Sequence, residues 1–281
     1  MMGFSSGRAQ PMAWPFLRIG NQTAFSASDP TDPYRFAVEH GFDAFEWFND
    51  KRHGWGWCQE DADEYDRRQI RQTGEEKHIA YSVHARCQAD ITTPEGREDV
   101  LRSIQFANDI GAKLVNIYFH GTQGVQGFAE ALRPIVEAAA PAQIKTSVEN
   151  TVFVGPEEFN DLFAFLREKE WYVPGQVGLC FDMGHANLCS ATRNNYVGFL
   201  EKLSSDVPIV HLHVHENWGD GDSHLPLFTG PAGMDDTGVR AMFRILKERG
   251  YDGLIIMEQW PQPAEQLLHT RQRLKELLLS L

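Results

Sequence analysis

Short apolar runs alternate with amphipathic stretches along the whole chain. Eight runs have the length of buried strands, at residues 16–20, 42–48, 79–85, 113–121, 144–150, 178–185, 209–217 and 253–260. Eight segments with helical spacing follow them, at residues 33–41, 62–78, 94–111, 127–140, 155–169, 194–204, 237–250 and 263–281. Several of these segments open at Pro, Thr or Asp, and the clearest end at Gly41, Gly111 and Gly250, as helix caps prefer.

This alternation predicts the fold class. Strands that alternate with helices form parallel β-α units. Eight such units favour an α/β protein with a closed (β/α)8 TIM barrel. A doubly wound open sheet fits less well, because neither GxGxxG nor GxxxxGK[ST] follows the first strand. No low-complexity linker interrupts the pattern, so we expect one domain over residues 1–281.

Composition narrows the class of protein. The hydrophobic fraction is 42% and the charged fraction 23%, which is ordinary for a soluble globular protein. No apolar run approaches the ~20 residues of a membrane helix, and polar residues interrupt the first twenty positions, so no secretory signal is expected. The four cysteines have no CxxC spacing, which predicts free thiols in a reducing cytoplasm; they are Cys58, Cys87, Cys180 and Cys189.

The net charge of the chain indicates which classes of binding partner to expect. A net charge of −13 disfavours binding to nucleic acid, whose phosphates an acidic surface repels. The densest basic cluster, Arg67, Arg68 and Arg71, follows four acidic residues and is interpreted as a solvated helix face. We therefore expect a small-molecule substrate, no nucleic acid and no membrane. Assembly into a homo-oligomer stays open.

The predicted strands end in residues that bind metals. In a barrel these ends meet at one mouth, where active sites lie. The residues at or just beyond the last six strands are His84, His120, Glu149, Asp182 with His185, then His211, His213 and His215, and finally Glu258. Although a single strand-end histidine is more typical of a hydrogen-bonded structural residue, the joint pattern favours a metal site.

The carboxylates favour a metal site most strongly. Glu149 and Glu258 follow apolar runs, where an unpaired charge would be costly to bury. Together with Asp182 they would repel one another at one barrel mouth unless a divalent cation held them. The three histidines of the seventh strand share one face but lie roughly 6.5–7 Å apart, so only one is expected to reach the same ion.

Four motifs in this order resemble the xylose isomerase-like, sugar phosphate isomerase/epimerase superfamily, which also contains endonuclease IV. They are SVEN, FDMGHAN, HLHVHEN followed by DSHLPL, and IIMEQW. The resemblance implies a metal held by Glu149, Asp182, His213 and Glu258. It also implies that His185 contacts substrate or metal. The extra ligands of the endonuclease IV zinc cluster correspond to His84, His120, His185, Asp222 and His224.

The loop after the seventh strand departs from the family pattern. The common form is HDN followed by HLPLGEG, whereas this chain has HEN followed by HLPLFTGPAGMD. Glu216 is one methylene longer than the usual Asp, and the loop is longer. We therefore do not transfer to this chain any substrate contact that the loop makes in the family.

These observations predict a metal-dependent sugar isomerase or epimerase acting on a small keto-sugar or polyol. The ion, Mn²⁺, Mg²⁺ or Zn²⁺, would polarise the carbonyl, and an enediolate would form between the two proton transfers. One of the catalytic pair Glu149 and Glu258 would remove the proton beside the carbonyl, and the other would return it. Three tryptophans near strand ends could stack on a sugar; they are Trp47, Trp218 and Trp260.

Three other functions remain as alternatives. An endonuclease IV-like zinc phosphodiesterase shares the extra ligands, but the acidic charge and the missing basic groove oppose it. An inosose-dehydratase-like lyase would also begin by removing a proton beside a carbonyl. The third alternative is a barrel without enzymatic activity, and the presence of both Glu149 and Glu258 argues against it. No phosphate cradle is recognised, which favours an unphosphorylated substrate.

Overall fold

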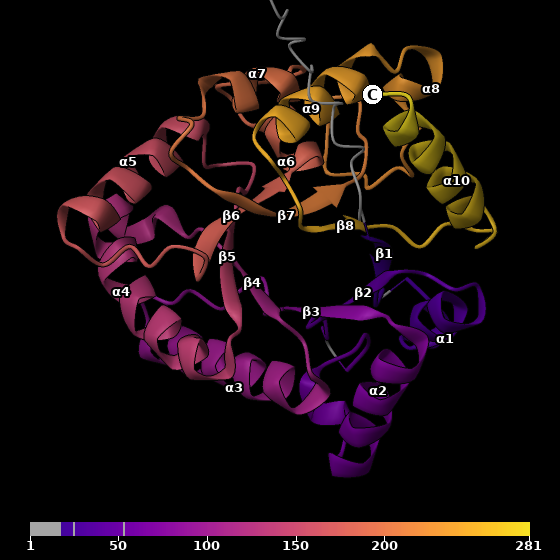
Figure 1. Ribbon diagram of the computed structural model, residues 1–281, viewed down its shortest axis with the longest axis horizontal. Coiled ribbons are helices and arrows are strands. Elements are labelled where there is room, and N and C mark those ends of the chain that lie inside the picture. The colour runs from indigo at the N-terminus through magenta and orange to yellow at the C-terminus, as the bar shows by residue number, and fades with distance from the viewer. Residues whose placement is uncertain (1–17, 25, 53) are drawn as a thin grey trace, which may run out of the picture.

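A closed barrel of parallel strands forms the centre of the molecule. The structure is a computed structural model that describes residues 18–24, 26–52 and 54–281. In this part of the chain, eight strands pair in sequence order and β8 pairs with β1 (Figure 1). Their bounds are β1 Arg18–Gln22, β2 Ala44–Phe48, β3 Ala80–His84, β4 Leu114–Tyr118, β5 Lys145–Glu149, β6 Val177–Asp182, β7 Ile209–Val214 and β8 Leu254–Met257.

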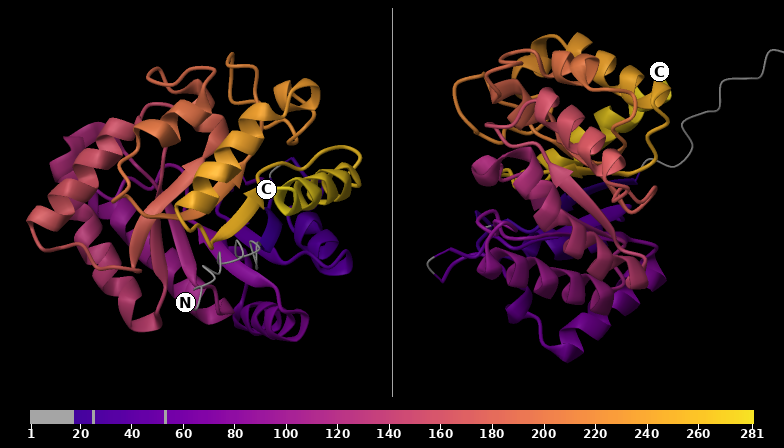
Figure 2. Two further views of the ribbon diagram at one scale, coloured as in Figure 1. Left: turned by 45° about the horizontal axis from the view of Figure 1, so that its top comes forward. Right: turned by 90° about the vertical axis from the view of Figure 1, so that its left-hand side faces the viewer.

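Helices surround the barrel as an outer layer, which Figure 2 shows from two further sides. Their bounds are α1 Asp32–Glu39, α2 Glu64–Lys77, α3 Pro94–Ile110, α4 Gly124–Ala139, α5 Pro156–Glu168, α6 Met183–Leu188, α7 Tyr196–Lys202, α8 Pro231–Met234, α9 Thr237–Glu248 and α10 Gln266–Leu279. Short 3₁₀ turns are η1 Gln59–Asp61, η2 Gly121–Gln123 and η3 Ala140–Ala142. No helix in the described part of the chain is long and apolar enough to cross a membrane.

The (β/α)8 prediction is confirmed. Each of the eight apolar runs overlaps a strand, and each of the eight predicted helical segments overlaps a helix, with bounds that differ by up to three residues, as at the start of α4. Residues 16 and 17 of the first predicted strand, and most of the segment used to judge a secretory signal, lie outside the described residues. The short helices α6 and α8 were not predicted.

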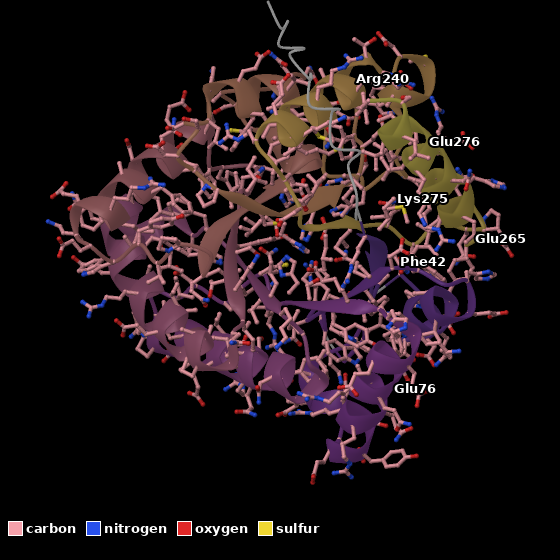
Figure 3. All side chains as sticks on the ribbon, in the orientation of Figure 1. Phe42, Glu76, Arg240, Glu265, Lys275 and Glu276 are labelled. Carbon is pink, nitrogen blue, oxygen red and sulfur yellow. The ribbon has the colours of Figure 1, made fainter. Side chains whose placement is uncertain are left out.

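The two faces of the sheet have different chemistry. Side chains alternate along a strand, so successive residues point to the helices and to the barrel interior. On β2, Phe45 and Trp47 are buried in the apolar layer, while Glu46 between them is buried among polar groups. Charged side chains such as Glu76 and Arg240 lie on the outer helices (Figure 3). Apolar burial beneath the helices holds the barrel together and leaves its interior available for polar residues.

Helix ends follow the sequence signals. Gly41, Gly111 and Gly250 have φ of 60°, 79° and 73°, values that an L side chain adopts only with strain. Gly111 caps α3, as its position in the sequence predicts. All four cysteines are free thiols, also as predicted.

Candidate metal centre and active site

Four predicted ligands meet at the mouth of the barrel. Glu149 ends β5, Asp182 ends β6, His213 lies on β7 and Glu258 follows β8. One ligand atom from each lies within 4.8 Å of the others, and all four residues are buried. Nδ1 of His213 is 3.2 Å from Glu258 Oε1, 3.4 Å from Glu149 Oε2 and 3.8 Å from Asp182 Oδ2. We refer to these four residues as the first ligand group.

The three carboxyl groups of this group have different charge states. Burial opposes ionisation of Glu149, but His213 and His84 beside it outweigh burial and hold its pKa well below the ordinary value. The pKa of Asp182 is also lowered, because the neighbouring histidines outweigh its burial. Burial, with the negative charges of Asp182 and Glu149, raises the pKa of Glu258 to about 8. At neutral pH the group therefore contains two carboxylates and one carboxylic acid.

The first ligand group fits a divalent cation. Glu149 Oε1 and His213 Nδ1 are buried without a hydrogen-bond partner, and such orphaned polar atoms are costly unless a ligand meets them. Three carboxylates with one imidazole suit Mn²⁺ or Mg²⁺, and Zn²⁺ accepts the same donors. A cation would also lower the pKa of Glu258 and remove the repulsion among the acids.

Hydrogen bonds from the layer below hold these ligands in place. The amide of Asn116 on β4 donates to Glu149 Oε2, and Ser147 in turn donates to Asn116 at 2.7 Å. His84 Nε2 is 3.0 Å from the same oxygen of Glu149. His84 therefore supports Glu149, and it also forms a possible ligand set with His213 and Glu258.

A second ligand group lies beside the first. It consists of His185, His215, Asp222 and His224, whose ligand atoms also lie within 4.8 Å of one another. Asp222 Oδ2 is 3.4 Å from His185 Nε2 and 3.2 Å from His224 Nε2, and the rings of His215 and His224 stack at 3.9 Å. Burial opposes protonation of His224, but Asp222 raises its pKa to about 9. The two groups share a boundary at Asp182, whose Oδ1 is 3.1 Å from His215 Nε2.

Local structure explains how His185 reaches this position. Asp182 Oδ1 accepts a hydrogen bond from His185 N at 2.7 Å and so caps α6, which turns back over the barrel mouth. Gly184 allows the helix to approach β7, since a Cβ there would lie 2.0 Å from Cε1 of His215. His185 Nδ1 is then 3.2 Å from Glu149 Oε1 and joins the two ligand groups.

The extra ligands implied by the resemblance separate into two sets. His185, Asp222 and His224 come together, and His84 contacts Glu149. His120 is half-buried beyond β4, 6.4 Å from the Tyr118 ring, and belongs to no ligand set among the described residues. The second ligand group contains His215 and not His120. The spacing of the histidines on the seventh strand had indicated a structural role for His215.

Glu46 is a further buried carboxylate beside the first ligand group, and it was not predicted from the sequence. Glu46 on β2 accepts hydrogen bonds of 2.7 Å from His211 Nε2 and from Ser82 Oγ, and its Oε1 is 2.9 Å from His213 Nε2. Burial opposes its ionisation, but His213 and His211 keep its pKa well below the ordinary value. The signal was present in the run FDAFEWF, where an acid interrupts apolar residues just as Glu149 and Glu258 do.

A cavity of about 380 Å³ opens at the strand ends beside Glu258 of the first ligand group. Its lining includes Glu258, His224 and the aromatic side chains of Phe48, Tyr118 and Trp260. Trp260 is thus placed where a substrate could contact it. Trp47 is instead packed in the core, 4.9 Å from Trp57, and Trp218 is 52% exposed.

The altered loop is anchored to the barrel by Glu216. Its carboxylate accepts hydrogen bonds from Ala232 N at 2.6 Å and Gly230 N at 3.2 Å, so it holds the start of α8. Its backbone pairs with Leu225, which places the segment containing Asp222 and His224 over the mouth. Glu216 therefore shapes the loop and belongs to neither ligand group.

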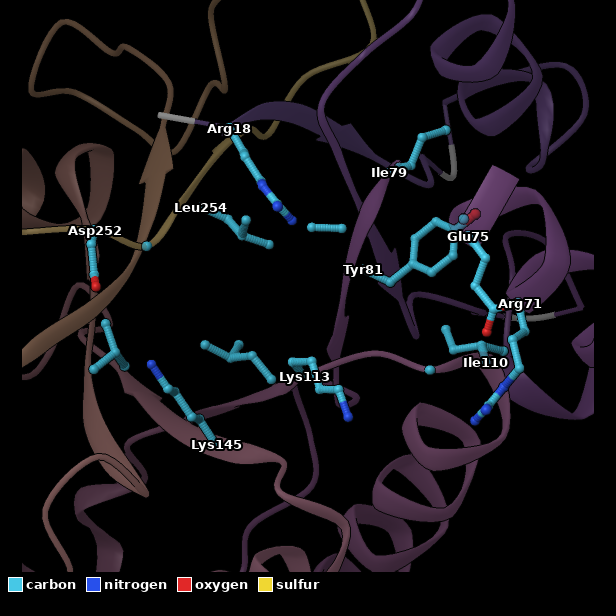
Figure 4. Close-up of a pocket in the computed structure, with 16 residues that line it drawn as sticks. Arg18, Arg71, Glu75, Ile79, Tyr81, Ile110, Lys113, Lys145, Asp252 and Leu254 are labelled. Atoms are coloured by element: carbon cyan, nitrogen blue, oxygen red, sulfur yellow. The ribbon is translucent and has the colours of Figure 1, made fainter. Parts of the chain in front are cut away.

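Another cavity, of about 360 Å³, lies at the opposite end of the barrel. Figure 4 shows the residues that line it. Residues near the starts of strands line it, among them Arg18, Lys113, Lys145 and Leu254. None of its lining residues belongs to either ligand group. The chemistry is therefore concentrated at the carboxyl ends of the strands, as expected for a barrel.

Comparison with known proteins agrees with this architecture. The sequence pattern of the xylose isomerase-like TIM barrel family matches residues 34–277. This chain belongs to that family. Among curated proteins, it is 33% identical over 134 residues to an uncharacterized protein of Methanocaldococcus jannaschii, a match that covers 45% of this chain. The match spans only 41% of the length of that relative.

Solved structures of sugar-converting proteins share the fold. A D-tagatose 3-epimerase-like protein superposes with a TM-score of 0.71 and 23% identity, covering 93% of this chain and 97% of that one. A xylose isomerase domain protein from Planctomyces limnophilus gives 0.67 and 15%, covering 94% and 97%. A 3-keto-D-glucoside 4-epimerase from E. coli gives 0.63 and 16%, covering 92% and 100%. At these identities the similarity establishes the fold alone.

Proposed function

We propose that the protein is a metal-dependent isomerase or epimerase that moves a proton beside the carbonyl of a small keto-sugar or polyol derivative. The observation that carries this proposal is the pairing of Glu149 and Glu258 in one buried ligand group. They come from β5 and from the end of β8, with β6 and β7 between them in the barrel. Two carboxyl groups that approach one site from different strands suit removal and return of a proton.

The charge states give each carboxyl group a role. Glu149, whose pKa is held low by His213 and His84 against its burial, is a carboxylate and can accept a proton. Burial raises the pKa of Glu258 to about 8 in the metal-free protein; a cation would lower that pKa, but Glu258 still holds a proton more readily than Glu149 and is therefore the proton donor of the pair. Asn116 and His84 fix the orientation of Glu149, so the accepting oxygen does not need to reorganise during the reaction.

A divalent cation held by Glu149, Asp182, His213 and Glu258 would supply Lewis acidity toward the substrate carbonyl. We expect His185, which lies between Glu149 and Asp222, to contact a substrate oxygen.

The mouth cavity suits an uncharged sugar. Phe48, Tyr118 and Trp260 provide apolar faces for the C–H groups of a sugar and help to exclude water. Arg52 is the one Arg or Lys among the described residues that line it, so the cavity lacks the cationic cluster typical of phosphate binding.

Solvent isotope exchange tests this function. The metal-loaded protein is incubated in D₂O with a panel of ketoses and 3-keto-glycosides, and deuterium at the carbon beside the carbonyl is measured by NMR and mass spectrometry. We expect exchange in the wild type and its loss in Glu149→Gln and Glu258→Gln. Glu248→Gln, at the exposed end of α9, is the matched control and should exchange normally.

Two outcomes would change the assignment. Isomer formation without exchange would indicate a hydride shift instead of proton transfer. Exchange accompanied by loss of water from the product would indicate the dehydratase-type lyase. Absence of exchange and of product with every ketone tested would reject the proposal.

A metal-dependent phosphodiesterase is the second candidate, because the second ligand group could hold further ions beside the first. The net charge of −13 opposes binding to a nucleic acid. Elemental analysis distinguishes the two functions: one ion per chain supports the isomerase, whereas two or three zinc ions with cleavage of abasic DNA support the phosphodiesterase.

A further inference from the structure

The buried carboxylate of Glu46 lies directly behind the histidine of the first ligand group. His213 has its two ring nitrogens on different sides: Nδ1 faces Glu149 and Glu258, and Nε2 is 2.9 Å from Glu46 Oε1. The strands that carry Glu46 and His213, β2 and β7, are not neighbours in the sheet, so this contact crosses the barrel interior. Both side chains are completely buried.

Glu46 is held from behind by two further groups. Its Oε2 accepts hydrogen bonds of 2.7 Å from Ser82 Oγ on β3 and from His211 Nε2 on β7. These contacts occupy one oxygen and leave Oε1 toward His213. Oε1 and His213 Nε2 are at ion-pair distance, and both atoms are buried without another hydrogen-bond partner.

We propose that Glu46 is the positioning residue of the metal centre, holding His213 by Nε2 so that its Nδ1 lone pair faces the ion. This inference rests on the metal centre of the proposed function. A neutral imidazole that binds metal through Nδ1 must carry its proton on Nε2, and that proton needs an acceptor. Glu46 Oε1 is the carboxylate oxygen within reach of Nε2 among the described contacts. An anionic acceptor also makes the imidazole a stronger ligand.

A purely structural role for Glu46 makes a different prediction. If it only neutralises the two buried histidines, its loss should lower stability and leave metal binding unchanged. If it positions His213, its loss should weaken metal binding in a protein that is still folded. Metal affinity, measured beside thermal unfolding, separates these two roles.

The test compares Glu46→Gln with Ser82→Ala. The first removes the charge behind His213 and keeps the shape, whereas the second removes one hydrogen bond to the far oxygen of Glu46 and does not contact His213. Mn²⁺ and Zn²⁺ affinities are measured by competition with a chromophoric chelator, and thermal unfolding is followed by circular dichroism. We expect a 10–100-fold loss of affinity in Glu46→Gln, the range typical of such supporting groups, and less than about threefold in Ser82→Ala.

Nuclear magnetic resonance of the zinc-loaded protein gives an independent readout. The Nε2 proton of His213 should resonate far downfield when it is shared with a carboxylate, and it should move upfield in Glu46→Gln. If Glu46→Gln does not fold, Glu46→Asp keeps the charge but withdraws it by one methylene, and its affinity should fall as well. Unchanged affinity in either folded variant, or an unmoved proton resonance, overturns the inference.

The outcomes also separate this inference from the proposed function. A wild-type protein that binds neither Mn²⁺ nor Zn²⁺ overturns both. A wild type that binds metal, depends on Glu46 for affinity and yet fails to exchange deuterium with any ketone supports the role of Glu46 and rejects the isomerase.

Discussion

Replacing Glu258 by Gln should change the number of protons that the protein releases when it binds a metal. A carboxyl group must be ionised to act as an anionic ligand, so a protonated Glu258 has to lose its proton first. Burial beside Asp182 and Glu149 raises its pKa to about 8, so at pH 7 about nine-tenths of the metal-free molecules carry that proton. Glu258→Gln has no such proton to lose. The wild type should therefore release about 0.9 proton more per ion at pH 7.

Isothermal titration calorimetry measures this difference. Metal is titrated at pH 7 in two buffers of different ionisation enthalpy, and the dependence of the apparent enthalpy on the buffer gives the number of protons released. Equal proton release by wild type and Glu258→Gln would refute the assignment of Glu258 as a neutral acid that becomes a ligand.

The same pKa predicts how the metal-free protein responds to pH. The folded pKa of Glu258, about 8, lies above the ordinary 4.5, so the neutral carboxyl is the favoured form in the fold. Its contribution to the free energy of unfolding is complete below pH 4.5 and is lost as the pH rises to about 8, by roughly 5 kcal/mol at 1.4 kcal/mol per pH unit. In urea titrations without metal, Glu258→Gln should lack this loss. If the difference in free energy of unfolding between wild type and variant were the same at pH 8.5 as at pH 5, the raised pKa of Glu258 would be contradicted.

Two further substitutions test the geometry of β7 and α6. His213→Ala should remove most of the metal measured by elemental analysis, whereas His211→Ala, which leaves every member of the first ligand group in place, should keep more of it; equal metal content would argue against His213 as the ligand. Gly184→Ala should lower the free energy of unfolding by about 1–3 kcal/mol, because the new Cβ would meet the ring of His215 at 2.0 Å. Gly121→Ala, with no atom within 4 Å of the new Cβ, is the control, and equal costs for the two in urea titrations would be inconsistent with that close approach.

The alternation of apolar runs and helical segments was enough to predict the barrel. Each strand is buried beneath helices, so its sequence is a short apolar run that ends where polar residues begin, and this signal is local. The helices α6 and α8 escaped prediction because Met183–Leu188 and Pro231–Met234 are too short to show a helical period. The position of α6 depends also on a tertiary contact, the close approach of Gly184 to the ring of His215.

The candidate site could be predicted less completely. The ends of the strands indicate which side chains lie at the barrel mouth, but they do not indicate which of those side chains contact one another. An acid within an apolar run led to the choice of Glu149 and Glu258, and the same reasoning applied to the second run would have found Glu46, which is also buried. The different contacts of the three histidines on and just after β7 could not be predicted from the sequence. His211 faces Glu46, and His215 faces the second ligand group because Gly184 leaves room for it. His120 ends a strand run like the others but joins no ligand set among the described residues.

Anomalous diffraction from crystals grown with Mn²⁺ tests the central claim most directly. Data collected on both sides of the manganese absorption edge locate each ion without reference to the protein chain. We expect one strong peak, surrounded by Glu149, Asp182, His213 and Glu258. A peak confined to His185, His215, Asp222 and His224, or no peak at the mouth of the barrel, would contradict it.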